Sequence, residues 1–122
     1  MLIFSGQCAT YPGRRTAIPD TLQDFKAELF RTLASGARIR ILEALRSRGT
    51  MTVGDLQQLL GLDPSNVSQH LAILRARSIV VGRREGNNVR YSIAEPAIPQ
   101  LLDAAREIFQ HQVDAGTRLL DG

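Results

Sequence analysis

The sequence predicts a mainly α-helical (α+β) domain of about five helices with one two-stranded β-hairpin. Apolar residues recur every three or four positions through residues 21–76 and again through residues 97–120, which is the period of amphipathic helices. Glycine-containing breaks divide the first stretch into four. Between the stretches, two β-rich runs in residues 79–93 flank the turn sequence Gly86-Asn87-Asn88. The expected order is therefore four helices, a hairpin and a last helix.

The first two helices are predicted between residues 21 and 46. The first begins near Thr21 and is broken by Ser35-Gly36, and the second occupies about residues 37–46 and stops before Gly49. In the first helix the apolar residues that repeat at three or four positions are Leu22, Phe25, Leu29 and Leu33. The second helix is expected to bury Ile39, Ile41, Leu42 and Leu45 on its inner face.

The third and fourth helices have clear start and stop signals. Thr52 is the expected N-cap of the third helix, and Gly61 is expected to end it. Asp63 is the expected N-cap of the fourth helix, with Pro64 at the first helical position, where a missing N–H costs nothing. Their inner faces are expected to be Val53, Leu56, Leu59 and Leu60, and then Val67, Leu71 and Leu74 with Ile73 at the edge.

The hairpin is predicted from strands at residues 79–85 and 89–93, and Pro96 and Pro99 introduce the last helix. These elements form one domain over residues 20–120, preceded by residues 1–19, which lack an apolar period and are expected to be a flexible arm. No apolar run approaches the roughly 18 residues that a membrane span needs. The start of the chain does not resemble a signal peptide, and Cys8 has no partner for a disulfide, so a cytoplasmic protein is expected.

Positive charge is concentrated in the middle of the chain, although the net charge is only +3. Residues 31–90 carry ten arginines against four acidic side chains, whereas residues 91–122 carry two arginines against five acids. A basic region of this kind is the electrostatic footprint expected for a polyanionic partner.

The fourth helix is the best candidate for reading DNA. Its non-apolar positions hold short hydrogen-bonding side chains, which can reach base edges or phosphates without the desolvation of a full charge. Together with the preceding helix and turn it forms a predicted helix-turn-helix, and the hairpin forms a wing. The alternative is that these positions are simply solvated. The residues concerned are Ser65, Asn66, Ser68, Gln69 and His70.

The predicted wing carries Arg83, Arg84 and Arg90 around Asn87 and Asn88. A two-stranded ribbon with guanidinium groups near its tip is suited to contact the DNA backbone or minor groove next to the major-groove site. The alternative is a charged, solvated face of the hairpin.

Residues 24–93 resemble the ArsR/SmtB family of winged-helix transcriptional regulators. The resemblance lies in four stretches that occur in the family's order: Leu29-Phe30-Arg31-Thr32-Leu33-Ala34, Ala37-Arg38-Ile39-Arg40-Ile41-Leu42, Ser65-Asn66-Val67-Ser68-Gln69-His70-Leu71 and Gly86-Asn87-Asn88-Val89-Arg90-Tyr91. It implies a homodimer that binds an imperfect inverted repeat in a promoter, usually as a repressor.

The resemblance also implies phosphate contacts by Arg38 and Arg40, with a salt bridge of either residue to Glu43 or Asp55 as an equal alternative. It further implies dimerisation through the first and last helices. The apolar stripe of the last helix is longer than a small core needs, and the alternative is that it packs only on its own domain. The dimer residues expected are Leu22, Phe25, Leu29, Leu101, Leu102, Ala105, Ile108, Phe109 and Val113.

Of the two metal sites that are common in this family, only one has candidate ligands in this chain. Residues 51–56 contain no cysteine, so the family's thiolate site is absent. The family's other site uses carboxylates and histidines of the last helix, and its pattern has two histidines where this chain has one. A zinc or nickel site shared across the dimer is one interpretation, and a solvated face with i,i+4 pairs is the other. The candidate ligands are Asp103, Glu107, His111 and Asp114.

Enzyme chemistry is not expected, because the chain has no glycine-rich phosphate loop and its two histidines lie on different predicted helices. The sequence therefore predicts a dimeric, sequence-specific DNA-binding regulator whose target is double-stranded DNA. The alternative is a winged helix that is regulated by, or acts through, a separate partner protein. Cys8 could be a sensing thiol, although a lone cysteine is more often incidental.

Overall fold

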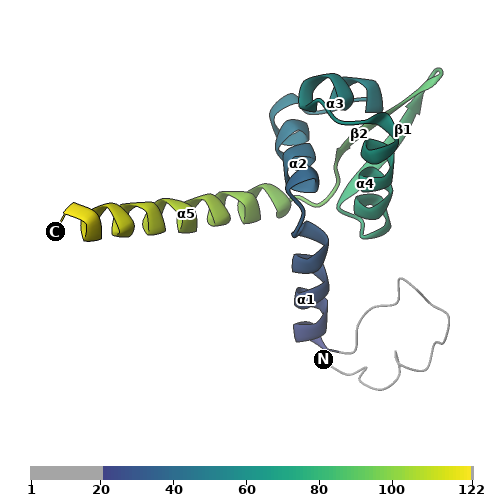
Figure 1. The fold of residues 1–122 in the computed structure, drawn as a ribbon. Helices are drawn as coiled ribbons and strands as arrows, with labels where there is room; N and C mark the ends of the chain where they lie inside the picture. The colour runs from purple at the N-terminus through teal and green to yellow at the C-terminus, as the bar shows by residue number, and fades with distance from the viewer. Residues whose placement is uncertain (1–20, 122) are drawn as a thin grey trace.

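The computed structural model describes residues 21–121, with side chains described through Gly116; the predicted arm at residues 1–19, including Cys8, lies outside the described residues. It contains five helices and a two-stranded antiparallel sheet, in the predicted order (Figure 1). Their bounds are α1 Leu22–Leu33, α2 Gly36–Arg48, α3 Val53–Leu60, α4 Pro64–Ala76, β1 Val80–Glu85, β2 Asn88–Ile93 and α5 Ile98–Asp121.

The head of the molecule consists of α2, α3, α4 and the hairpin, while α1 and α5 project from it in different directions (Figure 1). The core of the head is formed by apolar side chains that recur at helical spacing on α2 and α4 and is closed by residues from β1 and from the start of α5. The best-buried members are Ile41, Leu42, Leu45, Leu56, Val67, Leu71, Leu74 and Val80.

Two inner-face predictions were wrong. Ile39 is 37% exposed and Leu59 is 44% exposed. Ile39 precedes Ile41 by two residues, so it lies about 200° around the helix from that buried side chain. Leu59 lies at the edge of the buried face of α3, where only Leu56 is fully buried.

The helix-turn-helix is built on local capping. The Thr52 hydroxyl accepts a hydrogen bond from the Asp55 N–H, and the Asp55 carboxylate accepts one from the Thr52 N–H, which completes a capping box. These bonds lower the pKa of Asp55. Gly61 ends α3 in the left-handed region at φ 68°, where a side chain would be strained.

The hairpin pairs β1 with β2 from Val80↔Ile93 to Glu85↔Asn88, so its loop is Gly86-Asn87 rather than the predicted three residues. Gly86 has φ 63°, as tight hairpin loops require. At the base of the wing, Met51 and Tyr91 form an antiparallel bridge through two backbone bonds of 3.0 and 2.8 Å. This bridge fixes the wing to the segment between α2 and α3.

Polar contacts tie the projecting helices to the head. On α1, Glu28 forms an ion pair with Arg77, which follows α4, and the Thr32 carbonyl accepts a hydrogen bond from Arg38 of α2. On α5, Asp103 pairs with Arg46 of α2.

Candidate nucleic-acid interface

The outward face of α4 is polar and exposed to solvent. Ser65, Asn66, Ser68 and Gln69 are all exposed, whereas Val67, Leu71 and Leu74 are buried beneath them. At 100° per residue, Ser65 and Gln69 lie within about 40° of each other and roughly opposite the buried stripe. The structure thus brings four of the five predicted reading residues to the surface of one helix.

The start of α4 differs from the prediction in one respect. Asp63 is the N-cap by position, but its side chain makes no capping bond and instead accepts a hydrogen bond of 2.7 Å from the Ser65 hydroxyl. The carboxylate is satisfied by this neighbouring hydroxyl, so the first turn of α4 lacks a side-chain cap. Pro64 occupies the first turn as predicted.

The fifth reading residue, His70, is half-buried at the edge of α4. Its Nδ1 accepts a hydrogen bond of 3.3 Å from Nε of Arg38, and Nη1 of Arg38 also donates to the Thr32 carbonyl at 2.9 Å. Burial and the charge of Arg38 together lower the pKa of His70. Arg38 is therefore occupied by two acceptors of its own chain.

The salt bridges considered for Arg38 and Arg40 are absent from the described residues. Arg40 donates from Nη2 to the carbonyl of Leu60 at 2.9 Å, at the C-terminal end of α3, where unpaired carbonyls attract cations. Both arginines thus donate hydrogen bonds to neutral carbonyl or imidazole acceptors rather than to the carboxylates of Glu43 and Asp55.

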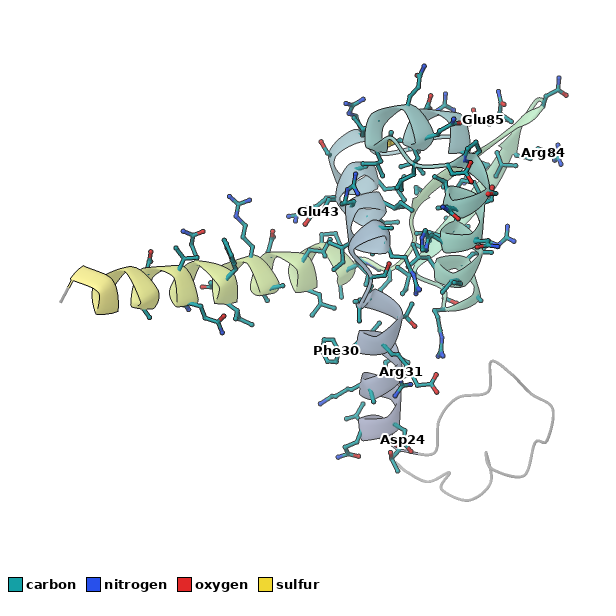
Figure 2. The ribbon with its side chains drawn as sticks, viewed as in Figure 1. Asp24, Phe30, Arg31, Glu43, Arg84 and Glu85 are labelled. Carbon is teal, nitrogen blue, oxygen red and sulfur yellow. The ribbon has the colours of Figure 1, made fainter. Side chains whose placement is uncertain are left out.

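The three arginines of the wing differ in whether their side chains have partners within the chain. Arg90 forms an ion pair with Glu85 at 3.3 Å, next to the hairpin loop, and donates to the Thr50 hydroxyl at 3.4 Å, so its guanidinium already has partners within the chain. The side chains of Arg83 and Arg84 are exposed and make no hydrogen bond or ion pair within the described residues. Figure 2 shows Arg84 projecting from the hairpin close to its tip, where Asn87 and Asn88 are also exposed.

Large apolar side chains are exposed on both projecting helices. Phe109 of α5 is 62% exposed, and Leu22, Phe25, Ile108 and Val113 are also exposed. A mostly apolar groove of about 750 Å³ lies between α1 and the start of α5, lined on its two sides by Phe25, Leu29, Ile98 and Leu101 among others. Leu102, predicted for the dimer interface, is only 8% exposed and belongs to the core of its own domain.

The predicted metal ligands do not gather in one chain. Within the described residues, no group of three or more histidine, cysteine or acidic side chains is placed to hold a metal ion. Both oxygens of Asp103 accept hydrogen bonds from Arg46, which lowers the pKa of Asp103. The stripe of Glu107, His111 and Asp114 lies roughly opposite the apolar stripe of α5 at 100° per residue. The four residues therefore fit a metal poorly, because an interface formed by the apolar stripe would turn them away from the second copy.

Several contacts that position the site were not anticipated from the sequence. The Arg38–His70 bond joins residues 32 apart, and the Arg46–Asp103 pair joins residues 57 apart. The arginines and acids were visible as charges, but no spacing rule pairs side chains at such separations.

This fold and this surface define a winged helix-turn-helix transcriptional regulator that binds DNA. A family described as "Helix-turn-helix domain" matches residues 33–83. The chain is 47% identical over 89 residues to the uncharacterized HTH-type transcriptional regulator Rv0081 of Mycobacterium tuberculosis. The matched residues make up 73% of this chain and 78% of that protein. The chain belongs to the ArsR/SmtB family of transcriptional regulators, and that family contains regulators rather than enzymes.

Solved structures agree with this assignment. The crystal structure of Rv0081 matches with a TM-score of 0.73 at 44% identity, covering 81% of this chain and 99% of that chain. The transcriptional repressor BigR from Xylella fastidiosa matches with a TM-score of 0.66 at 32% identity, covering 71% and 88% of the two chains. None of the helices in the described part of the chain is long and apolar enough to cross a membrane.

Proposed function

We propose that this chain is a homodimeric repressor that reads an inverted-repeat operator with α4 and contacts the adjacent backbone or minor groove with the wing. The observation that carries the proposal is the polar face of α4, where Ser65, Ser68 and Gln69 are exposed, beside a wing whose Arg83 and Arg84 side chains are also exposed. Relatives described as regulators and repressors support the repressor role.

The reading face can supply base contacts without burying a charge. Gln69 can pair with the N6 and N7 edge of adenine through its amide, and the serine hydroxyls can contact several bases or phosphates. The exposed guanidinium groups of Arg83 and Arg84 supply phosphate or narrow-groove contacts that position the reading helix.

The second copy is expected to cover the apolar faces of α1 and α5. A projecting helix that exposes Ile108, Phe109 and Val113 would leave a large apolar surface in water, which a soluble monomer rarely keeps. A two-fold dimer then presents two reading helices to half-sites about one helical turn apart, roughly 34–36 Å.

The test of DNA binding is fluorescence anisotropy on the protein's own promoter DNA across a salt series. We expect Gln69→Ala to weaken specific binding by about tenfold, the loss of one good base contact. Arg83→Ala is expected to weaken binding to all sequences and to make the salt slope shallower by about one. Gln58→Ala, an exposed glutamine on α3, is the matched control for Gln69→Ala. Tight binding by the wild type with the same affinity in Gln69→Ala and Arg83→Ala would contradict the proposed interface.

The dimer is tested by light scattering on a size-exclusion column. Phe109→Glu adds one charge to the exposed apolar stripe, and we expect it to give monomers. Gln110→Glu adds the same charge on the next residue, on the other side of α5, and is expected to leave the dimer intact. Absence of specific DNA binding by an intact wild-type dimer would instead favour a winged helix that acts through a partner protein.

A further inference from the structure

The guanidinium group of Arg38 lies at the junction of three helices. It belongs to the first turn of α2, donates from Nη1 to the Thr32 carbonyl in the last turn of α1, and donates from Nε to Nδ1 of His70 on α4. The side chain is half-buried, so these two bonds replace solvent contacts. One residue therefore connects a helix of the expected dimer interface to the reading helix.

This contact determines which nitrogen of His70 carries the proton. A guanidinium has donors and no acceptor, so the imidazole nitrogen that faces it must be an unprotonated acceptor. With Nδ1 accepting, a neutral imidazole carries its hydrogen on Nε2. The lowered pKa of His70 agrees with a neutral ring.

The Nε2–H of His70 remains available. Nε2 makes no hydrogen bond within the described residues. In that part of the chain no side-chain nitrogen or oxygen is both buried and without a partner, so Nε2 is accessible to solvent. His70 immediately follows Gln69 and lies at the edge of the polar face of α4. An N–H donor at this place can meet purine N7, guanine O6, thymine O4 or a phosphate oxygen, but not the N4 amino group of cytosine.

We propose that Arg38 is a positioning residue that holds His70 as an Nε2–H donor for an acceptor on the operator, rather than a phosphate ligand. The proposal rests on the proposed function, since it requires α4 to contact DNA. It means that His70 contacts DNA only as a hydrogen-bond donor. It also means that the position of this donor depends on the contact of Arg38 with α1.

Two substitutions of His70 separate the two ring nitrogens. In His70→Asn the amide oxygen can take the place of Nδ1 and keep the Arg38 bond, while the outward donor is lost. In His70→Gln the longer side chain can place its NH₂ group near Nε2 and keep the outward donor. We expect His70→Asn and His70→Ala to weaken specific binding by about fivefold to tenfold, as the loss of one hydrogen bond does, and His70→Gln to retain more affinity than either. Equal affinity of His70→Asn and wild type would overturn the proposal.

Arg38 is tested in a double-mutant cycle with His70. Arg38→Ala is expected to weaken specific binding several-fold in the wild type, to have no further effect in the His70→Ala background, and to leave the salt slope unchanged. A direct phosphate contact would instead weaken binding equally in both backgrounds and lower the salt slope by about one. Arg83→Ala, which removes the same charge from the wing, provides the positive control for the change in slope.

The tautomer can be measured without DNA. The chain has only two histidines, so ¹⁵N–¹H spectra of the imidazole groups assign His70 directly once His111→Gln removes the other signal. We expect the Nε2–H form in the wild type and a mixture of forms in Arg38→Ala. An Nδ1–H form, or the same single form in both proteins, would overturn the proposal even if the wild type binds DNA. A wild type with the expected tautomer but no specific DNA binding would instead contradict the proposed function and, with it, the role of the donor.

Discussion

Arg46 of α2 and Asp103 of α5 face each other in a two-pronged ion pair, with Nη1 2.7 Å from Oδ1 and Nη2 2.8 Å from Oδ2. Such parallel bonds fix orientation as well as distance. Together with the buried side chains of Ile98 and Leu102, the pair holds the start of α5 against the head. The rest of α5 projects from this anchor, so the pair lies where the expected dimer helix leaves the DNA-binding unit.

Loss of this ion pair should destabilise the protein only where Asp103 is ionised. The hydrogen bonds from Arg46 lower the pKa of Asp103 below its ordinary 3.8. The stabilisation is therefore complete well above pH 3.8 and is lost as the pH falls through the lowered, folded-state pKa. We expect Asp103→Asn to lower the thermal midpoint slightly at pH 7, because the pair is exposed, and to match the wild type in acid.

Thermal unfolding of both proteins along a pH series checks this prediction. Glu107→Gln is the control, because Glu107 is exposed on the same helix and makes no ion pair within the described residues. A deficit of Asp103→Asn that persists unchanged in acid would show that the aspartate stabilises the fold in another way.

Two leucines of α3 should differ sharply in their effect on stability. Leu56 is fully buried, and its replacement by alanine is expected to lower the free energy of unfolding by about 3 kcal/mol, through lost apolar burial and a residual cavity. Leu59 is 44% exposed, and Leu59→Ala is expected to cost less than about 1 kcal/mol. Urea unfolding of the two variants measures the contrast, and similar losses would mean that Leu59 is covered in solution.

Ser78 ends the turn after α4 in a left-handed conformation with φ 61°. The turn is closed by hydrogen bonds from the Ser78 N–H to the Arg75 carbonyl and from the Ile79 N–H to the Leu74 carbonyl, an arrangement in which glycine is usual. We expect Ser78→Gly to raise the free energy of unfolding by about 0.5–1 kcal/mol, because glycine relieves the clash of Cβ with its own backbone. Ser78→Ala keeps a Cβ and should change little. Denaturant unfolding measures both, and a destabilised Ser78→Gly would contradict the argument.

Zinc or nickel is not expected to release this protein from DNA through α5. A metal at Asp103 would have to displace two charge-assisted bonds from Arg46, and the other candidate ligands, Glu107, His111 and Asp114, lie away from the apolar stripe. Operator affinity should therefore be the same with a chelator and with added metal. Metal-dependent release that is abolished by His111→Gln would overturn this expectation and restore the α5 site.

The elements themselves were predictable because their causes are local. The caps at Thr52 and Gly61, the proline at the start of α4 and the hairpin loop at Gly86 act within a few residues, and the apolar periods identified Leu42, Leu71 and most of the core. The exposure of Ile39 was also accessible from the sequence, since helical spacing separates it from Ile41. The polar face of α4 followed from the same period.

The sequence by itself determined the order of helices and strands, the winged helix-turn-helix and the residues that α4 exposes. Only the tertiary structure decided which charged groups are free. It joins Arg38 to His70 and Arg46 to Asp103, and it leaves Arg83 unpaired within the described residues. Periodicity and capping depend on neighbours along the chain, whereas the partner of a long, flexible, charged side chain depends on which distant helix packs beside it.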